Sequence, residues 1–185
     1  MELISEVIKK GKQSIVLIPE IALTYQTLMR FYRRFGDRVS ILNSRLSAGE
    51  RYDQMLRAKR GEIDIMIGPR SALFTPFSNI GLIIIDEEHE ASYKSETVPR
   101  YHARETAIAR AKMVGASVVL GSATPSVESY EKALRGEYVL LQMPERITKK
   151  PLPKAYVVDL RTELKEGNRS ILSRKLQELM EERLQ

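Results

Sequence analysis

Short runs of branched aliphatic residues alternate along this chain with segments of helical periodicity, and this alternation restricts the fold more than any other feature. Runs predicted as strands are 14–18, 39–42, 62–67, 82–85 and 117–120; segments predicted as helices are 2–10, 22–35, 47–60, 102–113 and 126–134. Strands that are apolar on both faces, with helices between them, are typical of a parallel sheet covered on both sides. The sequence therefore predicts an α/β fold.

Length, charge and cysteine content narrow the class of protein. The 185 residues provide for one domain and a fraction of another, and the absence of cysteine excludes disulfides and thiolate zinc sites within this chain. The longest apolar run, 80–85, is far shorter than the roughly 20 residues that span a bilayer, so we expect no membrane partner. The lack of cysteine fits a cytoplasmic protein. A net charge of +6 favours phosphate-rich partners, although many basic faces are only solvated surface.

A proline-containing stretch near the C-terminus predicts a linker. Pro144, Pro151 and Pro153 lie among residues of mixed charge, and we place the linker at 147–154. It would separate a domain at 1–146 from a tail at 155–185, which is too short for a domain of its own. Within the tail, 156–158 is predicted as a strand and 172–184 as a helix.

Three acids follow the apolar run 82–85, at a strand end where open α/β sheets bind ligands. Asp86 could hold Mg²⁺ through water, and Glu87 could orient or deprotonate an attacking water. The alternative is a solvated loop, because acids are common after strands. A transition-metal site of Asp86, Glu87 and His89 is disfavoured, since the only other histidine, His102, has no matching ligand spacing.

Three further turns follow predicted strands, at 18–24, 68–74 and 121–126. Each one alone is compatible with an ordinary strand-to-helix turn. Together with Asp-Glu-Glu-His at 86–89, they resemble, in this order, the first motor lobe of superfamily 2 helicases. In that comparison 86–89 resembles the Walker B motif, and Gly-Ser-Ala-Thr at 121–124 resembles the motif that links nucleotide state to strand movement.

The resemblance narrows to the primosomal replication-restart helicases through segments 19–24, 68–74, 86–94 and 99–104. It implies a RecA-like lobe with ATP and Mg²⁺ as cofactors, and a parent protein that unwinds DNA at stalled or repaired forks and promotes primosome assembly. It also implies single-stranded and forked DNA, replication-restart proteins and single-stranded-DNA-binding protein as partners. The parent would be bacterial and nucleoid-associated, and would bind zinc outside this chain.

The same resemblance implies roles for individual residues. Asp86 and Glu87 would be catalytic, and His89, Ser122 and Thr124 would couple hydrolysis to DNA. Aromatic rings that stack on bases and basic groups that meet phosphates are typical of single-strand binding, and two surface tyrosines in a polar loop are the alternative. The residues implied in DNA binding are Thr24, Arg70, Ser71, Tyr93, Lys94, Arg100, Tyr101 and His102.

A phosphate-binding loop of the form Gly-x-x-x-x-Gly-Lys-Ser/Thr is absent from this sequence. Gly11-Lys12 is followed by Gln13, and the earlier glycine position is Glu6. The resemblance places the loop and the first strand of the lobe before Met1, and 155–185 at the start of the second lobe. We therefore expect the chain alone to be inactive, and a non-catalytic DNA-binding or scaffolding module is the alternative function.

The missing first strand leads to a structural expectation. We place it between the strands that end at Asp86 and Ser122, so that its absence would leave unpaired backbone groups on both sides of a gap. Buried unpaired groups cost about 1–3 kcal/mol each. The chain should then close the gap, or fill it with its own tail or another copy.

Overall fold

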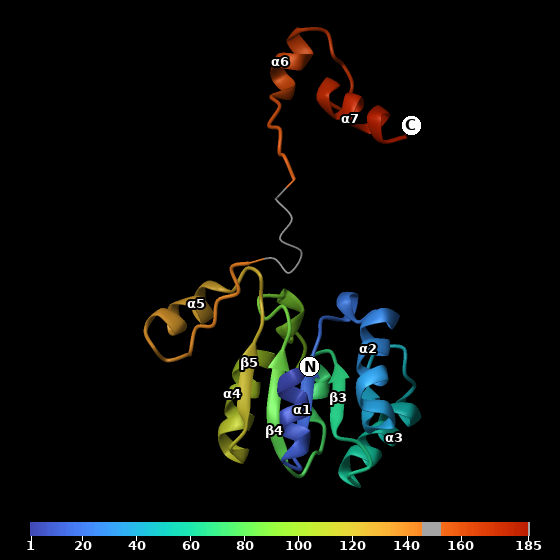
Figure 1. The fold of residues 1–185 in the computed structure, drawn as a ribbon, viewed down its shortest axis with the longest axis vertical. Coiled ribbons are helices and arrows are strands. Elements are labelled where there is room, and N and C mark those ends of the chain that lie inside the picture. The colour runs from blue at the N-terminus through green and yellow to red at the C-terminus, as the bar shows by residue number, and fades with distance from the viewer. Residues whose placement is uncertain (146–152, 185) are drawn as a thin grey trace. The chain divides into compact units, whose positions relative to one another are not determined.

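The computed structural model describes residues 1–145 and 153–184, which divide into two compact units, Met1–Leu140 and Leu141–Gln185 (Figure 1). The first unit contains a five-stranded parallel sheet in the order β2-β3-β1-β4-β5. This confirms the predicted α/β class with a parallel sheet. The strands are β1 (Gln13–Leu17), β2 (Val39–Ile41), β3 (Ile65–Gly68), β4 (Ile80–Ile85) and β5 (Ser117–Leu120).

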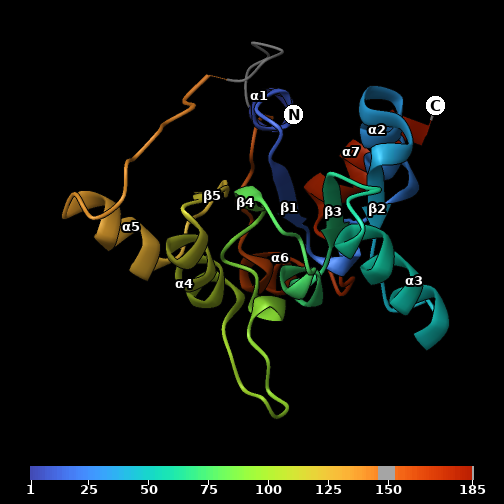
Figure 2. The same ribbon diagram turned by 90° about the horizontal axis from the view of Figure 1, so that it is seen from below.

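Helices cover both faces of this sheet, as Figure 2 shows. One apolar cluster joins Ile4 of α1 and Phe31 of α2 to Val16 and other residues of the sheet. A second cluster, on the opposite face, joins α3 and α4 to alternate residues of the same strands, such as Ile15. The helices of this unit are α1 (Glu2–Lys9), α2 (Tyr25–Phe35), α3 (Ala48–Lys59), α4 (Ala103–Val114) and α5 (Val127–Leu134).

Side-chain caps fix where two of these helices begin. Ser47 and Glu50 form the predicted capping box of α3: Glu50 N–H donates to Ser47 Oγ (3.2 Å), and Ser47 N–H donates to Glu50 Oε2 (2.7 Å). The predicted start of the preceding helix at residue 22 is wrong. Thr24 accepts from Thr27 N–H (3.3 Å) and caps α2, while Glu20–Ala22 forms a separate 3-10 turn.

The order of the strands corrects the position that we assigned to the missing strand. β4 and β5 pair directly, in an unbroken register from Leu82↔Ser117 to Ile85↔Leu120. There is no gap between the strands that lead to Asp86 and Ser122, and the sheet is continuous. β5 is instead an edge strand, so a further strand could pair only beside β5 or β2.

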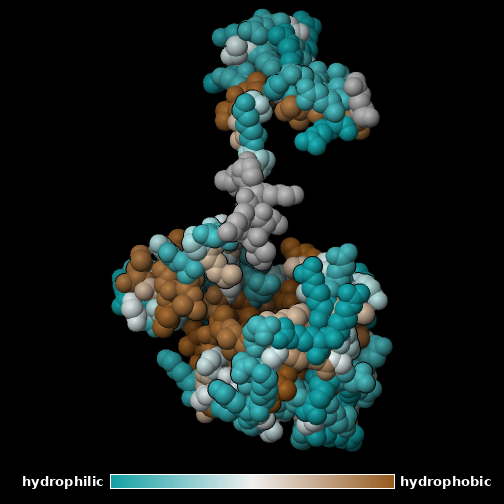
Figure 3. Space-filling model, viewed as in Figure 1, coloured by the Kyte–Doolittle hydropathy of each residue, from teal (hydrophilic) through white to brown (hydrophobic). Residues whose placement is uncertain are grey.

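Apolar side chains remain exposed on α5 and on the sheet beside it (Figure 3). Val127 and Leu134 of α5 are 81% and 65% exposed. Ile84 and Val119 lie on the face that carries α1 and α2 and are only partly buried. An apolar surface of this kind is typical of a region that contacts other protein.

The second unit contains α6 (Leu160–Lys165) and α7 (Arg174–Leu184). α7 matches the predicted helix at 172–184, whereas α6 was not predicted; Asp159 caps it by accepting from Arg161 N–H (2.9 Å). The strand predicted at 156–158 is wrong, because the described part of this unit provides no neighbouring strand for it to pair with. Of the predicted linker, residues 147–152 lie outside the described residues.

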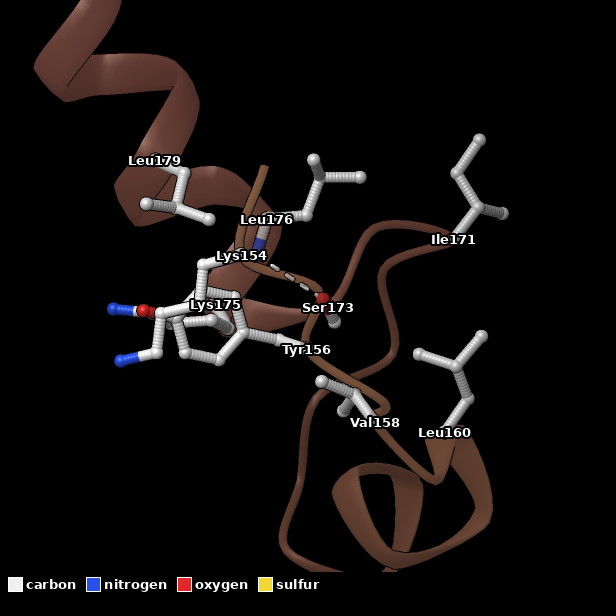
Figure 4. A pocket seen from close by; sticks show the side chains of 9 residues that line it. All are labelled: Lys154, Tyr156, Val158, Leu160, Ile171, Ser173, Lys175, Leu176 and Leu179. Atoms are coloured by element: carbon white, nitrogen blue, oxygen red, sulfur yellow. Dashed lines mark hydrogen bonds between the residues drawn. The ribbon is translucent and has the colours of Figure 1, made fainter. Parts of the chain in front are cut away.

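A pocket of about 420 Å³ opens in the second unit (Figure 4). The ammonium groups of Lys154 and Lys175 lie 4.9 and 5.4 Å from the centroid of the Tyr156 ring. None of the residues that we predicted to form the site lines this pocket. No helix in the described ranges is long and apolar enough to cross a membrane.

Candidate nucleotide and nucleic-acid site

Four segments meet at the carboxyl ends of four of the five strands. They follow β1, β3, β4 and β5, at 18–24, 69–74, 86–89 and 121–126. Backbone hydrogen bonds join neighbouring segments. Ile18 N–H donates to Gly68 O (2.9 Å), Asp86 N–H to Leu17 O (2.9 Å), and Glu88 N–H to Gly121 O (3.0 Å).

Asp86 and Glu87 project from this edge toward solvent. Asp86 Oδ1 accepts from Glu87 N–H (3.2 Å), and its Oδ2 has no partner among the described residues. Glu87 adopts φ +49°, the one positive value among non-glycine residues of the described chain. Such a conformation costs about 1–2 kcal/mol, and strained residues of this kind cluster at active sites and ligand-binding sites. The strained turn leaves the Glu87 carboxylate 43% exposed beside Asp86.

This donor set fits a hydrated Mg²⁺ and does not fit a protein-enclosed metal. Magnesium is usually bound by one or two carboxylates together with waters and substrate phosphates. Asp86 offers a carboxylate oxygen for that purpose. Within residues 1–145 and 153–184, no group of three or more His, Asp or Glu side chains lies close enough to hold a metal ion by itself.

The three residues predicted to couple hydrolysis to DNA lie together. His89 Nδ1 and Ser122 Oγ are 2.7 Å apart, and Thr124 N–H donates to the same Ser122 oxygen (3.0 Å). Glu87 Oε2 lies 3.6 Å from His89 Nδ1. A continuous path of side chains therefore connects Glu87 to the segment after β5, and the coupling role of these residues remains a prediction.

Glu88 is a residue that our sequence reasoning missed. Its side chain is buried and forms an ion pair with Arg104 (2.8 Å between Nη1 and Oε2), while Ser126 N–H donates to its Oε1 (2.7 Å). Burial alone would raise the pKa of Glu88, but the hydrogen bonds from Ser126, Arg104 and Ser129 hold the pKa below its ordinary value. No local signal distinguishes Glu88 from its acidic neighbours, because Arg104 is 16 residues away.

Tyr93 does not lie where we predicted. Its side chain is 1% exposed, packs in the core between the sheet and α4, and donates from its hydroxyl to Asp86 O (2.7 Å). Burial raises the pKa of Tyr93. Because neither face of the ring is available to a base, the stacking role that we assigned to Tyr93 is wrong in this conformation, and its contact with Asp86 supports the acidic turn instead.

Arg70 and Tyr101 hold the loop that follows the acids. Arg70 Nη1 donates to the carbonyls of Ser92 (2.8 Å) and Lys94 (2.9 Å). The ring of Tyr101 packs edge-on against Phe74 at 5.2 Å, and burial raises its pKa. Arg70 therefore connects the 3-10 turn Arg70–Phe74 to this loop. Tyr101 is half-buried, and part of its surface is accessible.

The other residues predicted to contact DNA are divided between caps and surface. His102 caps α4, with its Nδ1 accepting from Arg104 N–H (3.2 Å). Burial, and to a smaller extent the positive charge of Arg104, lower the pKa of His102. Accepting this bond requires an unprotonated Nδ1, and the lowered pKa favours that form. The exposed members of the predicted set are Thr24, Ser71, Lys94 and Arg100.

Comparison with known proteins identifies the family. Residues 1–133 match the family model described as DEAD/DEAH box helicase. The chain is 50% identical over 182 residues to "Replication restart protein PriA" of Bacillus subtilis (strain 168), covering 98% of this chain and 23% of that protein. It is 49% identical over 173 residues to the protein of the same name from Synechocystis, covering 91% of this chain and 21% of that protein.

These relatives confirm the resemblance that the motifs indicated, although the chain spans only about a quarter of their length. Among solved structures, a C-terminal domain of S. cerevisiae Dbp5 L327V bound to Gle1 H337R and IP6 matches with a TM-score of 0.47 and 15% identity, over 74% of this chain and 80% of that one. That match is too remote to support an inference. The family model alone covers more than two thirds of the sequence, and on that basis the chain belongs to the DEAD/DEAH box helicases.

Proposed function

We propose that this chain is part of the motor of an ATP-dependent DNA helicase that acts in replication restart. The observation that carries the proposal is the exposed Asp86–Glu87 pair at the end of β4, beside the contact between His89 and Ser122. Membership of the DEAD/DEAH box family and the name of the relatives, replication restart protein, support it. The parent protein would unwind DNA at stalled or repaired forks and promote primosome assembly, in the bacterial cytoplasm and associated with the nucleoid.

In the parent, the cofactors would be ATP and Mg²⁺, with zinc bound outside this chain. When it is bound, Mg²⁺ neutralises negative charge on the phosphates. Asp86 would hold the hydrated ion through its free carboxylate oxygen. Glu87 would orient the attacking water and accept its proton, a task that requires a carboxylate within hydrogen-bonding reach of that water. His89, Ser122 and Thr124 would couple ATP hydrolysis at this site to the bound DNA.

Single-stranded DNA would bind across the carboxyl edge of the sheet without regard to base sequence. Lys94 and Arg100 are exposed in the loop after the acids, and Thr24 and Ser71 are exposed at the segments after β1 and β3. Tyr101, whose ring packs against Phe74, offers a partly accessible ring for stacking. Forked DNA, replication-restart proteins and single-stranded-DNA-binding protein are the wider partners that we propose for the parent.

Binding to a fluorescein-labelled oligo-dT tests this proposal on the chain itself. Two or three phosphate contacts give a single-strand salt slope of about −1.4 to −2, so anisotropy should show roughly tenfold weaker binding when salt rises from about 50 to about 200 mM. Arg100→Ala should weaken binding at low salt. Arg135→Ala is the matched control, because Arg135 is exposed on the surface but pairs with Glu131 at the end of α5. Binding that ignores salt, or that depends strongly on base identity, would contradict the proposal.

A non-catalytic DNA-binding or scaffolding module is the second candidate function. The observation that favours it is the absence of a Gly-x-x-x-x-Gly-Lys-Ser/Thr segment from the sequence. For the same reason we expect the purified chain to release no phosphate from ATP above background, with or without DNA. DNA-stimulated phosphate release by the tag-free chain would show that this expectation is wrong.

A further inference from the structure

A buried ion pair joins three segments of the proposed site, and no role that we have described uses it. Glu88 is the third of the acids that follow β4. Arg104 lies in the first turn of α4, and Ser126 and Ser129 lie at the start of α5. We propose that Glu88 and Arg104 are positioning residues that fix the loop at 94–102 against the segment at 121–126. A polynucleotide bound at the loop would then alter the segment after β5. This inference rests on the proposed function, because it assumes that the loop binds DNA.

Glu88 and the start of α5 are held together by a saturated set of hydrogen bonds. Glu88 Oε2 accepts from Arg104 Nη1 (2.8 Å), Ser129 Oγ (3.0 Å) and Ser126 Oγ (3.1 Å), and Oε1 accepts from Ser126 N–H (2.7 Å). Arg104 Nη1 also lies 2.6 Å from Ser126 Oγ. The carboxylate therefore sits at the N-terminus of α5, where the helix dipole favours a negative charge.

The other end of the pair is tied to the loop. Arg104 N–H donates to His102 Nδ1 (3.2 Å), and His102 forms an isolated antiparallel bridge with Lys94. Ser95 N–H donates to Tyr101 O (2.8 Å), which closes the same loop. Because Arg104 is only three residues from Tyr101, a shift of the Tyr101 backbone would move the start of α4 and its guanidinium.

Stability alone does not account for a pair of this kind. Removing two charges from water offsets most of their attraction, and buried ion pairs can often be replaced by apolar residues without loss of stability. The pair instead fixes a relative position. Its donors and acceptors match in only one placement of the loop at 94–102, the acidic turn and α5. Glu88 also donates its N–H to Gly121 O (3.0 Å), so the segment after β5 is held from both of its ends.

Hydrogen exchange on the intact chain, with and without oligo-dT, measures this connection directly. In the wild type, oligo-dT should slow exchange at 94–102 and also change exchange at 121–126. Glu88→Gln breaks the pair and leaves the buried Arg104 charge with Glu105 as its remaining acidic partner (3.2 Å), and this can unfold the chain. The double variant Glu88→Gln, Arg104→Gln removes both charges, and should fold, bind oligo-dT, and lose the change at 121–126.

Two further variants separate positioning from a general loss of structure. Arg104→Lys keeps the charge and one contact to Glu88, and should retain the change at 121–126. Glu131→Gln is the matched control, because it removes an exposed acid that pairs with Arg135 on the same α5. It should behave as the wild type.

Each remaining outcome decides the inference. Persistence of the change at 121–126 in the double variant would overturn it, and so would a wild-type response confined to 94–102. A double variant that fails to fold would also overturn it, because the pair would then be needed for stability itself. Absence of any oligo-dT effect in the wild type would instead contradict the proposed DNA binding.

Discussion

Gly68→Ala tests whether the segment after β3 is held where the structure places it. Gly68 is buried at the end of β3, directly before Pro69 and Arg70. A Cβ atom built there would lie 2.7 Å from Leu42 O, and 3.1 Å from both Ala72 Cβ and Leu42 Cβ. The carbonyl of Leu42 belongs to the backbone and cannot rotate away, so the strand or the following turn must move.

The magnitude follows from two opposing effects. Overpacking a tight core site costs about 1–3 kcal/mol. Replacing glycine restricts the unfolded chain and returns about 0.4–1 kcal/mol. The net loss should be about 1–2 kcal/mol, which lowers the Tm of a unit of this size by about 3–7 °C.

Thermal denaturation followed by circular dichroism measures this loss, with Gly49→Ala as the matched control. Gly49 lies in the first turn of α3, and a Cβ atom there would have no neighbour within 4 Å. Since alanine favours a helix over glycine by about 0.5–1 kcal/mol, the control should keep or raise the Tm. If Gly68→Ala melted at the wild-type temperature, the close packing of β3 against Leu42 would be refuted.

Three further changes probe the residues around the acids. Tyr93→Phe should cost about 1 kcal/mol in urea denaturation, because Asp86 O loses its donor, while affinity for oligo-dT stays unchanged; a free energy of unfolding equal to that of the wild type would contradict the role of this contact. Tyr101→Ala should weaken oligo-dT binding by about 1–3 kcal/mol in anisotropy titrations, and an unchanged affinity would remove Tyr101 from the DNA site. The pKa of Glu88 is lowered in the folded chain, so its contribution to stability is present above the unfolded value of 4.5 and is lost as pH falls through the folded pKa. Melting at about pH 5 and about pH 3 should therefore show a smaller fall for the double variant Glu88→Gln, Arg104→Gln than for the wild type, and equal falls would contradict this account of Glu88.

Much of the fold could be read from periodicity and helix caps. The apolar run at 117–120 is β5 to the residue, and Ser47 and Ser126 mark the starts of α3 and α5 as expected. These features are local, because each depends on residues within a few positions of one another. The meeting of four segments at one edge also followed, since the carboxyl ends of parallel strands lie together.

What the sequence did not provide depends on distant contacts. The pairing of β4 with β5 is decided by hydrogen bonds between strands more than 30 residues apart, and no local pattern specifies which strand lies next to which. Tyr93 and Tyr101 look equivalent in the sequence, yet only Tyr93 fills a space between the sheet and α4. Glu88 resembles its acidic neighbours until Arg104 is brought to it by the packing of α4.

The central claim is that Asp86 and Glu87 divide the work of a nucleotide-hydrolysing site, and turnover by the two amide variants tests it most directly. The measurement requires a longer protein that carries this sequence together with a phosphate-binding loop. Glu87→Gln keeps the shape of the side chain but removes the base, so turnover should fall by about 10²–10⁴-fold while ATP affinity stays nearly normal. Asp86→Asn should weaken ATP affinity as well, because it disturbs the hold on Mg²⁺. If Glu87→Gln hydrolysed ATP at close to the wild-type rate, Glu87 would be no more than a solvated acid at the end of β4, and the account of the site would be wrong.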